Sequence, residues 1–273
     1  MQALHGKVAL VTGASAPKGI GRAIAQRLAQ DGAHVVVTDI SRAIEGGMTT
    51  RAGLLDALTQ DIITRGGSAL ALTLDVTSAR DIAAVLEQVL ARFGRLDILV
   101  NNAGSLAGSD NFLSTNAAQW TSSFEVNLLG PMMLSQAVIP EMRKLGGGRI
   151  INIGSTGSLG AEAGFGAYTA MKHGLVGLTK TLAAEFGPDG ILCNTVCPGF
   201  IATDMHEAAN TRLSQKQGMS VADIKQQRYA NVALRDAGLP QDVANAVAFL
   251  AGPEAQYVTG INLPVTGGVP FGI

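Results

Sequence analysis

The chain has 273 residues, of which 47% are hydrophobic and 15% are charged, and its formal net charge is −1 at pH 7. This length suits one large α/β sheet. The balanced charge, without any basic run, gives no indication of nucleic acid or of an anionic membrane surface as a partner. Residues 255–273 carry no charged side chain, but two prolines and four glycines in that stretch argue against a membrane-spanning helix.

Strands and helices alternate along the first hundred residues. Short apolar runs rich in β-branched residues have the pattern of buried parallel strands, and the stretches between them have helical periodicity. The connection over 41–53 is longer than a strand-to-helix loop normally needs. The expected strands cover 7–12, 33–39, 69–75 and 96–101, and the expected helices cover 22–30, 54–65 and 78–93.

The same alternation continues toward the C-terminus. Helices are expected over 114–144, 164–187 and 240–251, strands over 149–153, 191–196 and 257–263, and a polar, irregular segment over 200–235. Short links between strands and helices imply right-handed crossovers. Because there is no internal repeat and no linker, the sequence predicts a single domain over 1–273. The expected fold is an α/β, doubly wound Rossmann fold, with a mostly parallel seven-stranded sheet flanked by helices.

The two cysteines, Cys193 and Cys197, fall within or next to one expected strand. On one strand their Cα atoms would lie ~13 Å apart, which is beyond the reach of a disulfide. The apolar run at residues 1–11 is too short for a signal peptide. We therefore expect reduced, buried thiols in a cytoplasmic protein.

A glycine-rich turn containing Gly13, Gly19 and Gly21 joins the first strand to the first helix. Backbone N–H groups of such a turn, together with the helix N-terminus, can cradle a phosphate. The spacing departs from G-x-G-x-x-G, so a plain tight turn is the alternative. Asp39 ends the second strand 18 residues after Gly21, close to where a dinucleotide-binding acid bonds the ribose 2′-hydroxyl. The alternative for Asp39 is that it caps the next turn.

Tyr168 and Lys172 lie four residues apart in the helix expected over 164–187, so their side chains share one face of that helix. A phenol ordinarily titrates near pH ~10, and a neighbouring ammonium lowers its pKa toward the range where general acid–base catalysis is efficient. Such pairs are common, and a packed ring beside a solvated amine is the alternative.

In combination, these features resemble the short-chain dehydrogenase/reductase family over essentially the whole chain. Each motif alone is a weak signal, but their joint order and spacing, including thirteen residues from Ser155 to Tyr168, are specific. The matching residues are Thr12 and Gly13, Gly19 to Gly21, Asp75 and Val76, Asn101 to Gly104, Asn127, Ser155, Tyr168, Lys172, Pro198, Gly199 and Thr203.

The resemblance implies an oxidoreductase that transfers hydride between NAD(H) and a secondary alcohol or ketone. Tyr168 would be the acid–base, with its pKa lowered by Lys172 and by the positive nicotinamide, and Lys172 would also hold ribose hydroxyls. Ser155 would orient the substrate oxygen. Asn127 would hold a water in a proton relay, and its alternative is an ordinary polar residue of a helix.

The resemblance also implies a cofactor site, with the glycine turn at the pyrophosphate and Thr203 at the carboxamide. Asp75 and Val76 would meet the adenine, and Asn101 and Gly104 the adenosine side. The full implied set is Gly13, Ser15, Gly19, Ile20, Gly21, Asp39, Asp75, Val76, Asn102, Ala103, Gly104, Tyr168, Lys172, Pro198, Gly199, Ile201 and Thr203.

The choice between NAD and NADP depends on Asp39. A carboxylate accepts hydrogen bonds from a 2′-hydroxyl but repels a 2′-phosphate, which favours NAD. Lys18, directly before Gly19, points the other way, because a basic residue there often accompanies NADP in the family. We expect NAD, since Asp39 would lie against the discriminating group whereas Lys18 can turn into solvent.

Substrate specificity is expected from residues 105–108, 156–165 and 200–235, the last forming a mobile lid. Glu162 and His206 are the polar candidates nearest the chemistry, and for both the alternative is a solvated surface residue. The expected apolar walls are Leu159, Phe165 and Met205. Such a pocket suits a polyol, a sugar or a hydroxy acid.

Two further functions are considered. A reductase of 3-oxoacyl thioesters is the alternative within the family, and a non-catalytic dinucleotide-binding regulator or scaffold is the alternative from another class. A scaffold would normally lack one of Ser155, Tyr168 and Lys172. The four histidines have no ligand spacing, so no metal site is expected. The resemblance implies a homotetramer built on the helices over 114–144 and 164–187.

Overall fold

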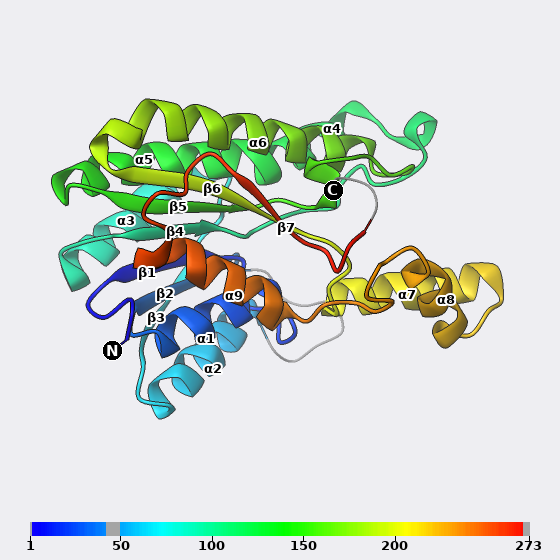
Figure 1. The fold of residues 1–273 in the computed structure, drawn as a ribbon, viewed down its shortest axis with the longest axis horizontal. Helices are drawn as coiled ribbons and strands as arrows, with labels where there is room; N and C mark the ends of the chain where they lie inside the picture. The colour runs from blue at the N-terminus through cyan, green and yellow to red at the C-terminus, as the bar shows by residue number, and fades with distance from the viewer. Residues whose placement is uncertain (1, 42–49, 270–273) are drawn as a thin grey trace.

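Seven parallel strands form one sheet in the computed structural model, which describes residues 2–41 and 50–269 (Figure 1). Their order in the sheet is β3-β2-β1-β4-β5-β6-β7. The doubly wound Rossmann fold predicted from the sequence is confirmed, and the described strands are all parallel rather than mostly so. The strands are β1 (Val8–Thr12), β2 (His34–Asp39), β3 (Ser68–Thr73), β4 (Ile98–Asn101), β5 (Gly148–Ile153), β6 (Ile191–Pro198) and β7 (Asn262–Val265).

Helices cover both faces of the sheet (Figure 1). On one face α1 (Ile20–Gln30), α2 (Arg51–Thr64) and α9 (Pro240–Ala251) contribute to one hydrophobic cluster, and on the other α3 (Ala79–Phe93), α5 (Gly130–Lys144) and α6 (Gly166–Phe186) contribute to a second. Because each parallel strand needs a crossover helix, the central strands are buried on both sides, and all five residues of β1 are buried. This burial explains the continuous apolar runs in the sequence.

The order of strands reverses between β1 and β4. From β1 the chain moves outward through β2 to β3, and it then returns to place β4 on the other side of β1. In open parallel sheets a ligand-binding crevice forms at the carboxyl ends of the strands where this reversal occurs. The loops after β1 and β4 are therefore the expected walls of a site.

The helix expected over 114–144 is interrupted. It consists of α4 (Ala117–Phe124), a π-helical turn (Glu125–Leu129) and α5, preceded by a 3-10 turn (Phe112–Ser114). Pro131 favours the interruption, because it has no N–H to donate to the carbonyl oxygen of Asn127, and the buried Asn127 side chain lies within the π-helical turn, where its Nδ2 donates to the carbonyl oxygen of Ser123 (3.0 Å).

The segment expected to be irregular over 200–235 contains two helices, α7 (Asp204–Gln217) and α8 (Val221–Tyr229), which project beyond the sheet (Figure 1). Their sequences are mostly polar, so they have no apolar stripe from which the two helices could be predicted. Their end signals were present, however. The Thr203 side chain accepts from the backbone N–H of His206, Gly218 is left-handed with φ 64°, and the Ser220 side chain caps α8.

Two further boundaries differ from the prediction. The last strand, expected over 257–263, is β7 at Asn262–Val265, after a short 3-10 turn at Pro253–Ala255. The helix expected from residue 54 begins at Arg51, where Thr50 caps it by accepting from the Gly53 N–H. Most of the 41–53 connection, residues 42–49, lies outside the described residues.

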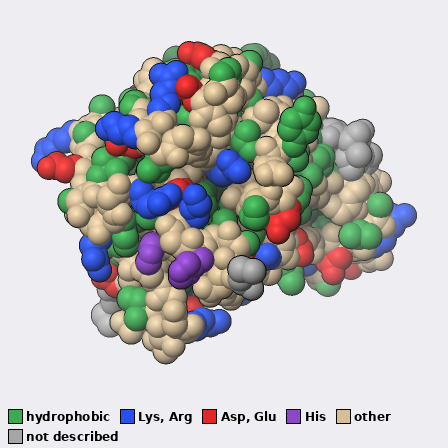
Figure 2. Space-filling model, turned by 60° about the vertical axis from the view of Figure 1, so that its left-hand side comes forward, with side chains coloured by type: hydrophobic (Ala, Val, Ile, Leu, Met, Phe, Trp, Pro, Cys, Tyr) green, Lys and Arg blue, Asp and Glu red, His purple; other side chains and the backbone are tan. Residues whose placement is uncertain are grey.

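Cys193 and Cys197 both lie on β6, buried and free, which confirms the expectation of two unpaired thiols. None of the helices in the described part of the chain has the length and apolar character needed to cross a membrane. On the face shown in Figure 2, basic and acidic side chains both occur, with hydrophobic side chains between them.

Candidate active site

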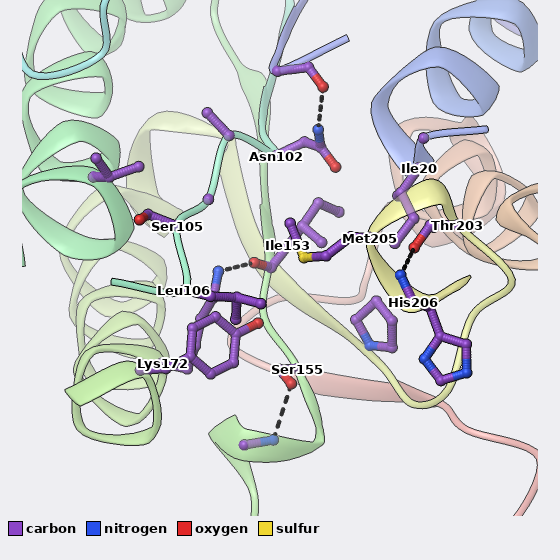
Figure 3. Close-up of a pocket in the computed structure, with 18 of the residues that line it drawn as sticks. Ile20, Asn102, Ser105, Leu106, Ile153, Ser155, Lys172, Thr203, Met205 and His206 are labelled. Carbon is purple, nitrogen blue, oxygen red and sulfur yellow. Dashed lines mark hydrogen bonds between the residues drawn. The ribbon is translucent and has the colours of Figure 1, made fainter. Parts of the chain in front are cut away.

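A cleft of about 760 Å³ lies at the carboxyl end of the sheet, between the loops that follow the strands and helices α7 and α8 (Figure 3). Most of the residues predicted for catalysis and cofactor binding line this one cavity. They are Gly13, Gly19, Ile20, Asp39, Asp75, Val76, Asn102, Ala103, Gly104, Ser155, Tyr168, Lys172, Pro198, Gly199, Ile201 and Thr203.

Three predicted residues lie behind the cleft wall instead. Ser15 is buried, and its hydroxyl donates to Asp39 Oδ2 (2.6 Å). Gly21 permits close packing, because a Cβ there would lie 2.5 Å from Nδ2 of Asn102. Asn127 is wholly buried in the π-helical turn. These three support the lining residues rather than face the cavity.

The turn after β1 has the features of a phosphate-binding loop. Gly13 has φ +68°, and a Cβ there would lie 2.8 Å from the Cα of Ala103. Asn102 Nδ2 donates to the carbonyl oxygens of Thr12 (2.8 Å) and Gly13 (3.0 Å), which fastens the loop after β4 to the turn. Helix α1 begins after Gly19 without a side-chain cap, so its first N–H groups are available to an anion. These features fit the pyrophosphate of a dinucleotide.

Asn101 does not lie where the sequence analysis expected. Its Nδ2 donates to Asn152 Oδ1 (2.8 Å) on the neighbouring strand β5, and the side chain is buried between strands and helices. Successive side chains of a strand point to opposite faces, and Asn102, one residue later, lines the cleft. The Asn101 side chain therefore does not face the cleft, and its adenosine-side role stays a prediction.

Asp39 lines the cleft and carries a network of hydrogen bonds. Its Oδ2 accepts from the backbone N–H (3.1 Å) and the hydroxyl of Ser15, and its Oδ1 accepts from the Ile40 N–H (2.9 Å). Arg51, the first residue of α2, places Nη1 3.7 Å from Asp39 Oδ1 and 3.2 Å from the Ser15 hydroxyl. Arg51 also lines the cleft, and it was not predicted because it falls within the connection over 41–53, to which no site residue was assigned.

The catalytic candidates meet where β5 and α6 approach each other. Lys172 is buried, its Nζ donates to the carbonyl oxygen of Ile153 (2.7 Å), and it lies 5.5 Å from the centroid of the Tyr168 ring (Figure 3). Ser155 follows β5, and its hydroxyl oxygen accepts from the Gly157 N–H (3.1 Å). Since Ser155, Tyr168 and Lys172 all line the cleft, a hydroxyl, a phenol and an amine face one volume.

Burial dominates the electrostatics of this group. It raises the pKa of the Tyr168 phenol above its ordinary value, and the Ser155 hydroxyl opposes this only in part. Burial also lowers the pKa of the Lys172 amine to about 8. Burial therefore acts against the lowered phenol pKa expected from Lys172 and the nicotinamide, and that lowering stays a prediction.

Asn127 holds the loop after β4. Its Nδ2 donates to the carbonyl oxygen of Ser105 (2.9 Å), and its Oδ1 accepts from the Ser105 N–H (3.1 Å). Pro131, four residues later, has no N–H to donate to the backbone carbonyl of Asn127. Through the two bonds to Ser105, the side chain of Asn127 positions a residue that lines the cleft.

The lid side of the cleft is formed by aromatic and polar residues of α7 and α8. His206 Nε2 and the Tyr229 hydroxyl are hydrogen-bonded at 2.8 Å, and their rings stack. Phe200 packs beside both rings. Glu162, Phe165, Met205 and His206 line the cleft as expected, and Arg212 and Arg228 are lining residues that the sequence analysis did not name. Leu159 is not among the lining residues.

Comparison with known proteins identifies the family. A family model described as enoyl-(acyl carrier protein) reductase matches residues 13–270. The 3-oxoacyl-(acyl-carrier-protein) reductases of Vibrio cholerae and Escherichia coli are 41% and 42% identical to this chain, and each alignment covers 97% of this chain and 98% of the relative.

Solved structures agree with these matches. An actinorhodin polyketide ketoreductase with NADPH superposes with a TM-score of 0.87 at 35% identity, covering 96% of this chain and 97% of that one. Levodione reductase superposes with a TM-score of 0.88 at 30% identity, covering 97% and 98%. The chain belongs to the short-chain dehydrogenase/reductase family and is an oxidoreductase that acts on a carbonyl or hydroxyl group with a nicotinamide dinucleotide.

Proposed function

We propose that this protein reduces the 3-oxo group of an acyl thioester to a 3-hydroxyacyl product, in a reaction that can also run in reverse. The observation that carries the proposal is the convergence of Ser155, Tyr168 and Lys172 in a cleft that also contains the glycine turn. Two relatives named for this reaction, at 41% and 42% identity, favour the thioester over the polyol, sugar or hydroxy acid expected first.

In this proposal the nicotinamide supplies the hydride in reduction and accepts it in oxidation. Tyr168 gives its hydroxyl proton to the carbonyl oxygen during reduction, since a phenol with an ordinary pKa near ~10 is protonated at neutral pH. The Ser155 hydroxyl donates to the same oxygen and orients it. The Lys172 ammonium, anchored on the Ile153 carbonyl, stabilises the phenolate that remains.

The dinucleotide would be held along the cleft by the residues named above. The N–H groups at the start of α1 and the turn from Gly13 to Gly19 would receive the pyrophosphate. Asp75 and Val76 would flank the adenine, and Thr203, which caps α7, would meet the carboxamide. Ser15, Gly21 and Asn127 would act as positioning residues behind this surface.

We further propose that NAD is preferred, with incomplete discrimination against NADP. Asp39 offers a carboxylate oxygen to a ribose 2′-hydroxyl and repels a 2′-phosphate. Arg51, 3.7 Å from Asp39, offsets much of that repulsion and presents its own donors to a phosphate. Lys18 is exposed, and its backbone N–H donates to Asp204 (3.1 Å).

A substrate panel tests the proposed reaction. Oxidation of NADH would be followed with acetoacetyl-CoA and ethyl acetoacetate, and reduction of NAD with polyols, sugars and 3-hydroxy acids. We expect the 3-oxoacyl compounds to have values of kcat/KM at least about tenfold above those of any polyol or sugar. Efficient oxidation of a polyol or sugar without turnover of the 3-oxoacyl compounds would contradict the proposal.

A non-catalytic regulator or scaffold is the competing function from another class. Retention of all three catalytic candidates in one cleft counts against it. The homotetramer and the cytoplasmic location expected from the sequence stay predictions.

A further inference from the structure

The lid side of the cleft contains a guanidinium, that of Arg228, whose setting differs from that of the neighbouring Lys225 ammonium. Arg228, on α8, lines the cleft and is half-buried. Within the described part of the chain, no carboxylate lies within ion-pair distance of it. Lys225, one turn earlier, is paired with Glu207 at 2.9 Å. A half-buried cation without a carboxylate partner is costly unless its charge is used.

The guanidinium is held in a fixed orientation. Its Nη1 donates to Oδ1 of Asn210 on α7, and its Cζ lies 4.9 Å from the centroid of the Phe200 ring, so that it stacks on that ring. Asn210 is wholly buried, which makes it a rigid anchor. An arginine has five N–H donors in a planar fork, and the bond to Asn210 uses one of them. The remaining donors are available along the cleft.

The position of Arg228 is that of a substrate contact. Phe200, on which it stacks, follows Pro198 and Gly199 at the end of β6, and all three line the same cavity as Tyr168. Arg212 of α7 also lines the cavity and is exposed. Two cations, Arg212 and Arg228, therefore line the cleft on the lid side. The exposed carboxylate of Glu162, from the loop after β5, also lines it.

We propose that Arg228, with Arg212 at the rim, binds an anionic group of the substrate, and this inference rests on the proposed reduction of a 3-oxo group. The group is a carboxylate or a phosphate, because the guanidinium fork matches the oxygens of both. A phosphate would come from the pantetheine arm of the proposed thioester substrate, and a carboxylate from a free 3-oxo acid, which would replace the thioester in the proposed reaction. The site thereby selects charged over neutral 3-oxo compounds.

The main competing explanation is structural. The bond from Arg228 to Asn210 joins α8 to α7, so Arg228 could serve only to hold the lid together. A structural role would change stability, or kcat and KM together for every substrate. A binding role changes KM selectively for substrates that carry the anionic group. The distinction therefore requires pairs of substrates that differ only in that group.

The test uses two such pairs, acetoacetate with ethyl acetoacetate, and acetoacetyl-phosphopantetheine with acetoacetyl-pantetheine. Arg228→Met removes the charge but keeps an extended apolar side chain over Phe200, and Arg228→Lys keeps the charge. Lys216→Met, on the exposed side of α7, is the matched control. We expect Arg228→Met to raise KM for the charged member of one pair by on the order of tenfold to a hundredfold. Its effect on the neutral member should be under about threefold, and Arg228→Lys should restore part of the loss.

The pair in which KM rises selectively for the charged member identifies the anion. The first pair would identify a carboxylate, and the second would identify a phosphate. Equal changes for charged and neutral members, or a wild type without preference for either charged member, would overturn the inference while turnover of the neutral compounds still supported the proposed reaction. A weakened Kd for NADH in Arg228→Met would assign the arginine to the cofactor and also overturn it. If the wild type turned over none of the four compounds, the proposed reaction would fail. The inference would then be decided by binding: NADH fluorescence would give the Kd of each of the four compounds for the enzyme–NADH complex, in the wild type and in Arg228→Met.

Discussion

At the scale of single residues, the balance of charge around Asp39 is central to cofactor choice. The sequence predicted the position of Asp39 correctly, at the end of β2 and facing the cleft. It could not show that the Arg51 side chain lies beside Asp39, because no local sequence pattern relates the first residue of a helix to the last residue of a strand 12 residues earlier. The repulsion of a 2′-phosphate by Asp39 is therefore smaller than the carboxylate alone implies.

Two substitutions separate these charges. Asp39→Ala should raise kcat/KM for NADP on the order of tenfold, because it removes the repulsion and leaves Arg51 unpaired. Arg51→Ala should lower kcat/KM for NADP by a similar factor and change that for NAD by less than about threefold. Steady-state rates with both cofactors measure this, with the exposed Lys216→Ala as the control. A wild type that prefers NADP, or an Arg51→Ala protein with unchanged NADP use, would refute the assignment.

His206 gives a residue-scale prediction about pH. Burial is the largest cause that lowers its pKa, to about 4, and the charge of Arg228 lowers it further, while Glu207 opposes and Lys225 adds to the lowering. Between pH 6.5 and about 4 the unfolded chain binds a proton at this site that the folded protein does not, so folding stability falls as pH falls through that window. Between pH 6.5 and about 4, the free energy of unfolding measured with urea should fall more steeply with pH for the wild type than for His206→Gln. Equal slopes for the two proteins would contradict the lowered pKa of His206.

At the scale of elements, the structure differs from the prediction where polar residues decide the backbone. The sheet and its flanking helices followed from apolar periodicity, which is why their bounds agree within a few residues, except that β7 begins at Asn262 rather than at residue 257. The π-helical turn encloses the buried Asn127 amide and precedes Pro131, which has no N–H, and α7 and α8 depend on capping residues rather than on an apolar face. Periodicity cannot detect either.

Asn127 carries the element-scale prediction. Asn127→Ala should reduce the free energy of unfolding by about 1–3 kcal/mol, because the N–H and carbonyl of Ser105 lose buried partners. It should also lower kcat, since Ser105 lines the cleft. Urea unfolding and steady-state rates measure both, with the exposed Asn231→Ala as the control. An unchanged stability would show that Asn127 does not hold this loop.

At the scale of the whole molecule, the order of motifs predicted the fold, and most of the residues that the motifs singled out line one cavity. The relative placement of distant lid residues such as Arg228 could not be predicted, because it depends on how α7 and α8 pack.

The assembly of subunits is a second feature of the whole molecule that was predicted from the sequence. Phe112 and Leu113, near the start of α4, are 68% and 90% exposed, which suits burial against another subunit.

We expect a homotetramer in solution. Sedimentation equilibrium at micromolar concentration should give a mass near four times the 28.0 kDa chain. A monomer at that concentration would count against the assembly.

The most direct measurement of the central claim, that the Tyr168 hydroxyl transfers the proton, compares Tyr168→Phe with the wild type. The variant should bind NADH with a Kd within about twofold of the wild-type value, because the cofactor cleft is retained, while kcat for a 3-oxoacyl substrate falls by on the order of a hundredfold to ten-thousandfold. Tyr257→Phe, at a fully exposed position, should leave both values unchanged. Turnover of Tyr168→Phe close to that of the wild type would contradict the account.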